Sequence, residues 1–339
     1  MRARQADVAR EAGVSPRTVS NVINGYPHIR PETVARVQAA IAKLNYIPNR
    51  AARNLRTGKI GIIGLAVPEL NLPYFADLAT RITTAAEARG YTILIDITEG
   101  RAERERLIAG GLRPHAIDGL IWSPLRLRAQ EVDEASDGTP LVLLGEWTEP
   151  SGNHAYVGID NIAAAGVATR HLTELGRRRI AAIGTVLGRE GGTASQRYEG
   201  YRRAMEAAGL PLRQEPVRKF DRVQGALAME RLLEDEQPPD AVFCFNDLVA
   251  IGALSVLRRR GLAVPDDVAL IGWDDIPEVS YSWPPVSSIR VDADQIAANA
   301  VEMIIDQLSG ARRGELHRTV GYTLVAREST IGAKAGAEA

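Results

Sequence analysis

The chain has 339 residues, of which 45% are hydrophobic and 24% charged, a composition typical of a globular protein with two or three domains. Its one cysteine, Cys244, excludes an intrachain disulfide and is expected to be a buried structural thiol. No Cys and His cluster has metal-ligand spacing, and we expect neither a metal nor a cofactor. Residues 1–20 are polar and no apolar run approaches the length of a membrane span, so we expect a cytoplasmic protein.

The net charge of -1 hides an asymmetry between the beginning of the chain and the rest. Residues 1–59 contain eleven Lys or Arg against three Asp or Glu, a balance of +8, whereas the other residues sum to -9. A small basic unit joined to a larger acidic one suits attraction to phosphate at one end of the chain. The alternative is a basic face that is simply solvated.

Residues 7–24 have the pattern of two short helices around a three-residue turn. Gly13 can adopt the left-handed conformation of such a turn, and Ser15 followed by Pro16 favours the start of a second helix. This geometry places a helix in the DNA major groove, although a helical hairpin that only packs gives the same pattern. The residues expected to face outward as candidate base readers are Pro16, Arg17 and Asn21.

The next segment completes a small domain and leads into a basic joint. Residues 31–44 carry apolar residues along one helical face, and Tyr46 and Ile47 are expected to help close the core. Pro48 then breaks the chain, so we place the first domain at residues 1–48.

The joint, residues 49–59, can form about two helical turns, and a helix this short is marginal alone in water. DNA or a second copy would therefore have to order it. Leu55 would then be an apolar wedge in the minor groove, with Arg53 and Arg56 near phosphates. The alternative is a flexible linker whose leucine packs on the rest of the chain.

From residue 60 onward, strand-like apolar runs alternate with helical stretches, which predicts an α/β fold with parallel sheets covered by helices. The strand-like runs are residues 60–67, 91–97, 119–122, 141–144, 180–183, 241–245 and 268–271. These are too many strands for one small sheet, so we expect two lobes within residues 60–331 and a ligand site in the cleft between them. The expected division is about 60–160 with 292–320 in lobe 1 and about 161–291 with 321–331 in lobe 2.

Twelve short strings, in a fixed order from about residue 5 to 331, resemble landmarks of the lactose-repressor (LacI/GalR) family of bacterial regulators. They are residues 7–9 (DVA), 12–15 (AGVS), 18–20 (TVS), 24–25 (NG), 44–49 (LNYIPN), 52–55 (ARNL), 61–64 (GIIG), 118–121 (DGLI), 245–247 (FND), 264–268 (VPDDV), 271–275 (IGWDD) and 325–330 (VAREST). The resemblance implies a helix-turn-helix head, a hinge helix and a two-lobed body like a periplasmic binding protein. It also implies a homodimer, a pseudo-palindromic operator DNA and a small-molecule effector.

The resemblance assigns DNA contacts to twelve residues. They are Ser15, Pro16, Arg17, Thr18, Asn21, Asn24, Tyr46, Asn49, Ala52, Arg53, Leu55 and Arg56. Asn21 stands where an arginine is frequent in the family, and Pro16 and Arg17 form an individual reading pair, so no relative's operator can be transferred to this chain. Arg4 and Arg30 stand where a Ser or Thr cap is usual, so we expect weaker caps on the first and third helices. Residues 332–339, expected to be a disordered tail, lack the leucine heptads by which some relatives tetramerise, which favours a dimer.

The resemblance also assigns effector contacts. Polar contacts fall on Glu146, Arg197, Asn246 and Asp274, and the walls fall on Tyr74, Phe75, Trp147 and Phe220. A guanidinium fork, carboxylate acceptors and aromatic faces suit a sugar or sugar derivative. A nucleobase stays open, because Trp147 also occurs in relatives that bind purines. Without the resemblance, Asp274 reads as a turn or cap residue and Arg197 as half of a surface ion pair; Trp273 and Trp283 are expected in the core or at the rim.

The expected function is a sequence-specific transcriptional regulator, by family default a repressor, whose operator affinity depends on the effector. The rival class is an enzyme or a solute-binding protein with a sugar cleft. The adjacent carboxylates Asp274 and Asp275 do not establish two groups flanking a scissile bond, and residues 61–64 lack the lysine of a P-loop and the third glycine of a dinucleotide site. We therefore expect no enzymatic activity.

Overall fold

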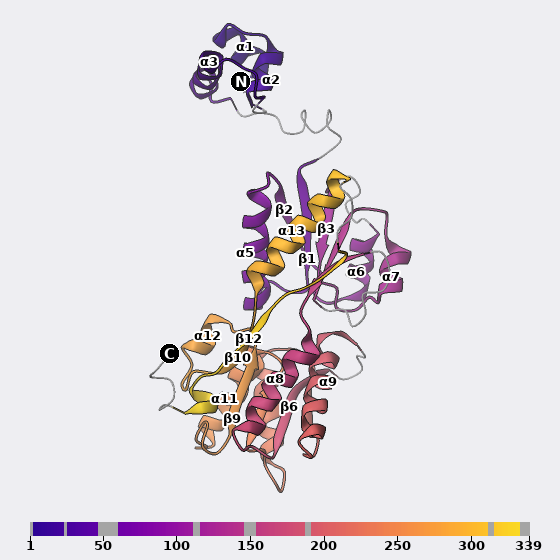
Figure 1. The fold of residues 1–339 in the computed structure, drawn as a ribbon, viewed down its shortest axis with the longest axis vertical. Helices are drawn as coiled ribbons and strands as arrows, with labels where there is room; N and C mark the ends of the chain where they lie inside the picture. Colours follow the sequence, from indigo (N-terminus) through magenta and orange to yellow (C-terminus); the bar gives the residue numbers. More distant parts are fainter. Residues whose placement is uncertain are drawn as a thin grey trace. The chain divides into compact units, whose positions relative to one another are not determined.

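The computed structural model describes residues 3–23, 26–46, 60–110, 116–145, 154–186, 191–310 and 315–332. It divides into two units, Met1–Ile60 and Gly61–Ala339, which we treat separately (Figure 1). The expected hinge helix and most of the expected tail lie outside the described residues. Within the described residues, no helix has the length and apolar character needed to cross a membrane.

The first unit contains three helices, α1 (Gln5–Ala12), α2 (Pro16–Ile23) and α3 (Pro31–Lys43). Its first turn begins where the carboxylate of Asp7 accepts the N–H of Arg4 (2.9 Å), and α1 ends at Gly13 in the left-handed conformation (φ 65°). The hydroxyl of Ser15 accepts the N–H of Thr18 (3.1 Å), so α2 starts at the predicted cap. The buried core consists of Val8, Ala9, Ala12, Val19, Val37 and Ala40.

In the second unit, lobe 1 contains a parallel sheet with the order β11-β5-β4-β3-β1-β2 among the described residues. Its strands are β1 (Ile62–Val67), β2 (Thr92–Ile97), β3 (Gly119–Trp122), β4 (Leu141–Leu144), β5 (Ala155–Gly158) and β11 (His317–Thr319). Helices α5 (Pro73–Glu87) and α13 (Ala293–Ser309) pack together on one face, and α6 (Ala102–Ala109) and α7 (Ala129–Ala135) cover the other (Figure 1).

Lobe 2 contains a second sheet with the order β12-β10-β9-β8-β6-β7. Its strands are β6 (Ile180–Val186), β7 (Gln214–Val217), β8 (Ala241–Cys244), β9 (Ala269–Trp273), β10 (Ser287–Val291) and β12 (Tyr322–Val325), which is antiparallel to β10. Helices α8 (Asn161–Glu174) and α9 (Gly192–Ala207) pack against each other, as do α10 (Arg222–Leu233) and α11 (Asp247–Arg259). The short helices α12 (Pro277–Ser280) and α14 (Glu328–Ile331) follow β9 and β12. Cys244 is fully buried in this core, as expected.

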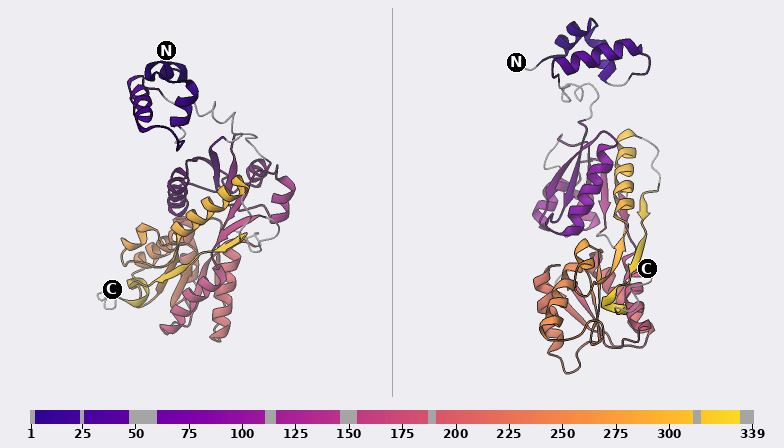
Figure 2. Two further views of the ribbon diagram at one scale, coloured as in Figure 1. Left: turned by 45° about the horizontal axis from the view of Figure 1, so that its top comes forward. Right: turned by 90° about the vertical axis from the view of Figure 1, so that its left-hand side faces the viewer.

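The chain passes between the lobes three times, after β5, after β10 and after β11. Figures 1 and 2 show the last passage in yellow, where the chain continues from β11 in lobe 1 to β12 in lobe 2. The fold therefore confirms the predicted α/β architecture with two sheets. It adds an antiparallel strand to the second sheet, which the apolar runs did not predict.

Two glycines let α10 and α11 approach each other closely. A Cβ added to Gly225 would lie 2.2 Å from the carbonyl oxygen of Val249, and one added to Gly252 would lie 2.1 Å from that of Arg222. Because both obstacles are backbone atoms inside helices, they cannot move aside without separating the helices. Tight helix packing in lobe 2 thus depends on the absence of a side chain at these positions.

We expect Gly252→Ala to lower the free energy of unfolding by about 1–3 kcal/mol, the usual cost of overpacking a core. Gly166→Ala in α8 is the matched control, because its methyl group would meet the movable end of Arg170 at 3.0 Å. That control should be neutral or stabilising, since alanine has the higher helix propensity. Urea unfolding followed by circular dichroism measures both, and equal losses would contradict the packing argument.

Candidate DNA-reading helix and effector cavity

Helix α2 presents the residues that the sequence proposes for DNA contact. Pro16 and Arg17 are exposed, whereas Thr18 and Asn21 are half-buried. The hydroxyls of Ser15 and Thr18 lie 2.9 Å apart within the cap of the helix, so both already have a structural role. Of the proposed reading residues, Arg17 is therefore the one with an exposed charged side chain.

The other proposed DNA contacts divide into two groups. Tyr46 packs half-buried against the three-helix core, which matches its expected role in closing that core. The remaining residues lie outside the described parts of the chain: Asn24, Asn49, Ala52, Arg53, Leu55 and Arg56.

A cavity of about 90 Å³ lies between the two lobes, beyond the carboxyl ends of the strands in both sheets. Six of the eight residues proposed for effector contact line it: Tyr74, Phe75, Arg197, Phe220, Asn246 and Asp274. The other two, Glu146 and Trp147, lie outside the described residues. The structure thus brings together around one cavity side chains that are up to 200 positions apart in the sequence.

Arg197 projects from α9 and is held by three contacts in lobe 2. Its guanidinium carbon lies 4.1 Å from the ring centroid of Trp273, a cation–π geometry. Its Nε donates to Oδ1 of Asn161 (3.2 Å), and another nitrogen donates to the carbonyl of Phe245. These contacts fix the plane of the guanidinium, so it reaches the cavity as an oriented group of donors.

Asn246 and Asp274 enter the cavity from the ends of adjacent strands. Asn246 caps α11, because its Oδ1 accepts the N–H of Val249 (2.9 Å), while its amide donates to the carbonyl of Phe220 (3.3 Å). Asp274 follows β9 with a left-handed backbone (φ 102°), an uncommon conformation for a residue with a side chain. Helix α12 begins at Pro277, and its N-cap residue Ile276 makes no side-chain cap, so Asp274 does not cap this helix. The other part of that alternative holds, because Asp274 lies in the turn after β9.

Among the cavity-lining residues that sequence reasoning did not propose, Asn161 and Trp273 hold Arg197 in place. Asn161 is 2% exposed at the start of α8, where its amide donates to Gln196 (2.9 Å) and its oxygen accepts from Arg197. Trp273 is fully buried in the core of lobe 2, as expected, and it also lines the cavity, which was not expected. The sequence signal that could have identified Trp273 as a cavity residue is its position next to Asp274 in residues 271–275. Trp283 is 72% exposed and is absent from this lining.

The cap made by Asn246 can be separated from any ligand role. We expect Asn246→Ala to lower the free energy of unfolding by about 1 kcal/mol, because the first turn of α11 loses its acceptor. Asn246→Ser should lose much less, since serine also caps helices. Thermal or urea unfolding without ligand measures both, and equal destabilisation by the two variants would show that the cap does not carry the effect.

Known proteins resemble this chain in both units. Residues 6–49 match the family described as bacterial regulatory proteins, lacI family, and residues 169–330 match a periplasmic binding protein-like domain. The HTH-type transcriptional repressor PurR of Photorhabdus laumondii subsp. laumondii is 32% identical over 330 residues, which cover 96% of each chain.

Two solved structures add the architecture. A transcriptional regulator CelR–cellobiose complex is 31% identical, with a TM-score of 0.70, over 97% of this chain and 100% of that one. The lac repressor dimer bound to operator and the anti-inducer ONPF is 25% identical, with a TM-score of 0.84, over 97% of this chain and 99% of that one. The resemblance inferred from the sequence strings is confirmed along nearly the whole length, and the chain belongs to the LacI family of bacterial transcriptional regulators.

Proposed function

We propose that this protein is a transcriptional repressor whose binding to a pseudo-palindromic operator is controlled by a sugar or sugar derivative in the interlobe cavity. One observation carries the proposal: the lobe 2 wall of the cavity contains Arg197, oriented over Trp273, together with the polar residues Asn246 and Asp274. In this proposal residues 1–48 read DNA as a homodimer, residues 49–59 form the hinge, and residues 60–331 bind the effector.

The chemistry of the cavity supports a polyol ligand. Arg197 offers a planar set of donors, Asp274 offers acceptors and Asn246 offers both. Tyr74, Phe75 and Phe220 supply apolar surface that suits the C–H face of a sugar ring. The CelR relative, solved with cellobiose, supports the same class of ligand.

Control of DNA binding follows from the two-lobed body. A ligand that contacts both walls stabilises one arrangement of the lobes, and it can shift an equilibrium only by its difference in affinity for the two arrangements. We propose that the favoured arrangement changes how two hinge segments pair on the operator. Leu55 would be the minor-groove wedge in that pairing.

A thermal-shift screen of sugars, sugar phosphates and purines tests the effector class. A sugar present at 100 times its Kd should stabilise the protein by about 2.7 kcal/mol, because it binds only the folded state. Asp274→Asn should weaken that sugar at least about tenfold, or about 1.4 kcal/mol. Asp266→Asn, at an exposed position outside the cavity lining, is the matched control and should keep the shift. A purine that raises stability while no sugar does would overturn the sugar proposal.

Gel shifts with DNA flanking the protein's own gene test the reading role of Arg17. We expect Arg17→Ala to reduce discrimination between this DNA and random DNA by about 1–3 kcal/mol, as for a lost bidentate contact to guanine. Arg36→Ala, an exposed arginine on α3, should leave discrimination unchanged. Equal loss of affinity on both DNAs would make Arg17 a phosphate contact instead.

A further inference from the structure

The turn that carries Asp274 into the cavity has an unusual backbone. Asp274 and the following Asp275 both adopt left-handed conformations, with φ of 102° and 53°. Residues with side chains occupy this region uncommonly, and they persist there only where the surrounding structure holds them. The contacts of this turn therefore decide where the Asp274 carboxylate lies.

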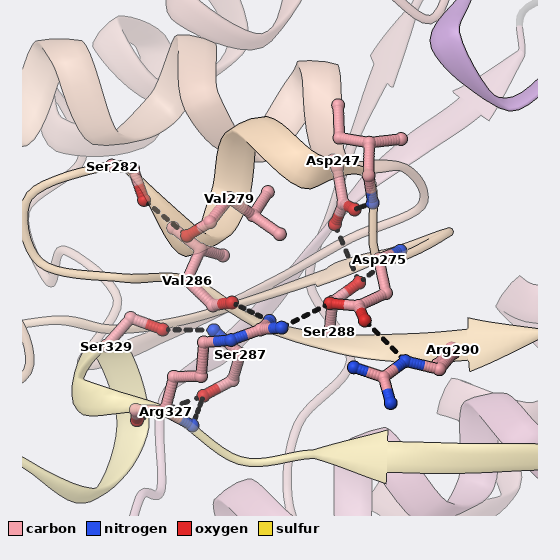
Figure 3. Close-up of polar contacts among 11 residues, drawn as sticks. Asp247, Asp275, Val279, Ser282, Val286, Ser287, Ser288, Arg290, Arg327 and Ser329 are labelled. Carbon is pink, nitrogen blue, oxygen red and sulfur yellow. Dashed lines mark hydrogen bonds and ion pairs between the residues drawn. The ribbon is translucent and has the colours of Figure 1, made fainter. Parts of the chain in front are cut away.

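The successive N–H groups of the turn are each bound by lobe 2. Asp274 donates to the carbonyl of Ile289 (2.9 Å), and Asp275 donates to Oγ of Ser288 (3.0 Å). Ile276 donates to Oδ2 of Asp247 (2.8 Å). The hydroxyl of Ser288 in turn donates to Oδ1 of Asp247 (2.7 Å) (Figure 3). One carboxyl group thus holds two of the three N–H groups, one directly and one through a serine.

Asp247 is fully buried and does not line the cavity. Gly272 leaves the space for it, because a Cβ added there would lie 2.1 Å from Oδ1. Burial raises the pKa of Asp247 well above its ordinary value, and the nearby carboxylates of Asp274 and Asp275 raise it further. Burying a carboxyl group costs free energy unless hydrogen bonds compensate for the lost water. The donors to the Asp247 carboxyl are the N–H of Ile276 and the hydroxyl of Ser288.

Asp275 does not line the cavity. It is 5% exposed and pairs with Arg290 (2.6 Å) and Arg327 (2.7 Å), as Figure 3 shows. Arg290 belongs to β10, and Arg327 lies just beyond β12. Because these strands adjoin two of the three passages between the lobes, the turn joins the cavity wall to the segments that connect the lobes.

We propose that Asp247 is a positioning residue of the effector cavity, which fixes the turn at residues 274–276 and thereby the place of the Asp274 carboxylate. This rests on the proposed function, because the consequence for a ligand requires that the cavity binds one. The claim about the turn can be measured without any ligand.

Hydrogen exchange of the full-length protein, followed by mass spectrometry, tests the turn. In Asp247→Ala we expect the amides of residues 275 and 276 to exchange at least tenfold faster. Ile276 loses its acceptor, and Ser288, the acceptor of Asp275, loses the carboxyl group that holds its hydroxyl in place. Asp247→Asn should restore most of the protection, since its amide oxygen still accepts from Ile276. Unchanged exchange in the alanine variant would overturn the proposal.

Asp240→Ala is the matched control. Asp240 lies at the opposite end of β8, where its carboxylate accepts the N–H groups of Arg178 (3.1 Å) and Arg179 (2.9 Å). Its removal should speed exchange at residues 178 and 179 and leave the turn protected. Faster exchange at residues 275 and 276 in this control as well would show a general loosening of lobe 2 and overturn the specific role.

Titration with cellobiose measures the consequence for the cavity. We expect Asp247→Ala to weaken cellobiose at least tenfold, whereas Asp247→Asn should stay within about threefold of the unchanged protein. A loosened turn with unchanged cellobiose affinity would overturn the positioning role. If cellobiose does not bind the unchanged protein, cellobiose is excluded as the effector, and exchange at residues 275 and 276 still decides the role of Asp247.

A second variant is available in case Asp247→Ala does not fold. Ser288→Ala removes the link between Asp247 and residue 275, and we expect faster hydrogen exchange of the amide of residue 275. Unchanged exchange there would overturn the proposal.

Discussion

The body of this protein depends on the direction of its strands. In each sheet the parallel strands end at the edge that faces the other lobe, so the loops after them gather polar side chains around one cavity. The exception follows from the same constraint. The chain leaves β11 at this edge of lobe 1 and enters lobe 2 from the cavity side, so β12 must run against β10.

Local chemistry accounts for what the sequence predicted well. Gly13 ends the first helix, and Ser15 with Pro16 starts the second. These helix ends were predictable because they depend on neighbouring residues and need no distant partner. The strands predicted from apolar runs correspond to β1, β2, β3, β4, β6, β8 and β9. Six of the proposed effector residues also meet in one cavity, although that placement relied on the family resemblance rather than on periodicity.

The features that the sequence did not reveal depend on distant partners. Strand β10 begins with Ser287 and Ser288, two polar residues that are fully buried. Hydropathy cannot identify such a strand, because the hydroxyl groups of its two serines are satisfied by Thr330 and Asp247, about 40 positions away in the sequence. Strand β7 reads Gln-Glu-Pro-Val and lies at the edge of its sheet, where proline is tolerated but no apolar run is needed.

Each lobe holds an irregular loop with a buried carboxylate. In lobe 1 the fully buried Glu105 accepts the N–H groups of Leu125, Arg126 and Leu127 at 2.7–2.9 Å, just after β3. In lobe 2 Asp247 accepts one N–H group of the turn after β9 directly and holds a second through Ser288. Both loops follow strands that end at the cavity, where side chains must be aimed without regular backbone pairing.

The complete burial of Cys244 has a practical consequence. It is the one thiol in the chain, it has no exposed surface, and burial raises its pKa well above the ordinary value. Maleimide reagents attack the thiolate of accessible cysteines, so the native protein should resist them. A cysteine placed at one exposed site in each lobe would therefore take up fluorescent dyes in a native background, and the distance between the lobes could be followed directly in solution.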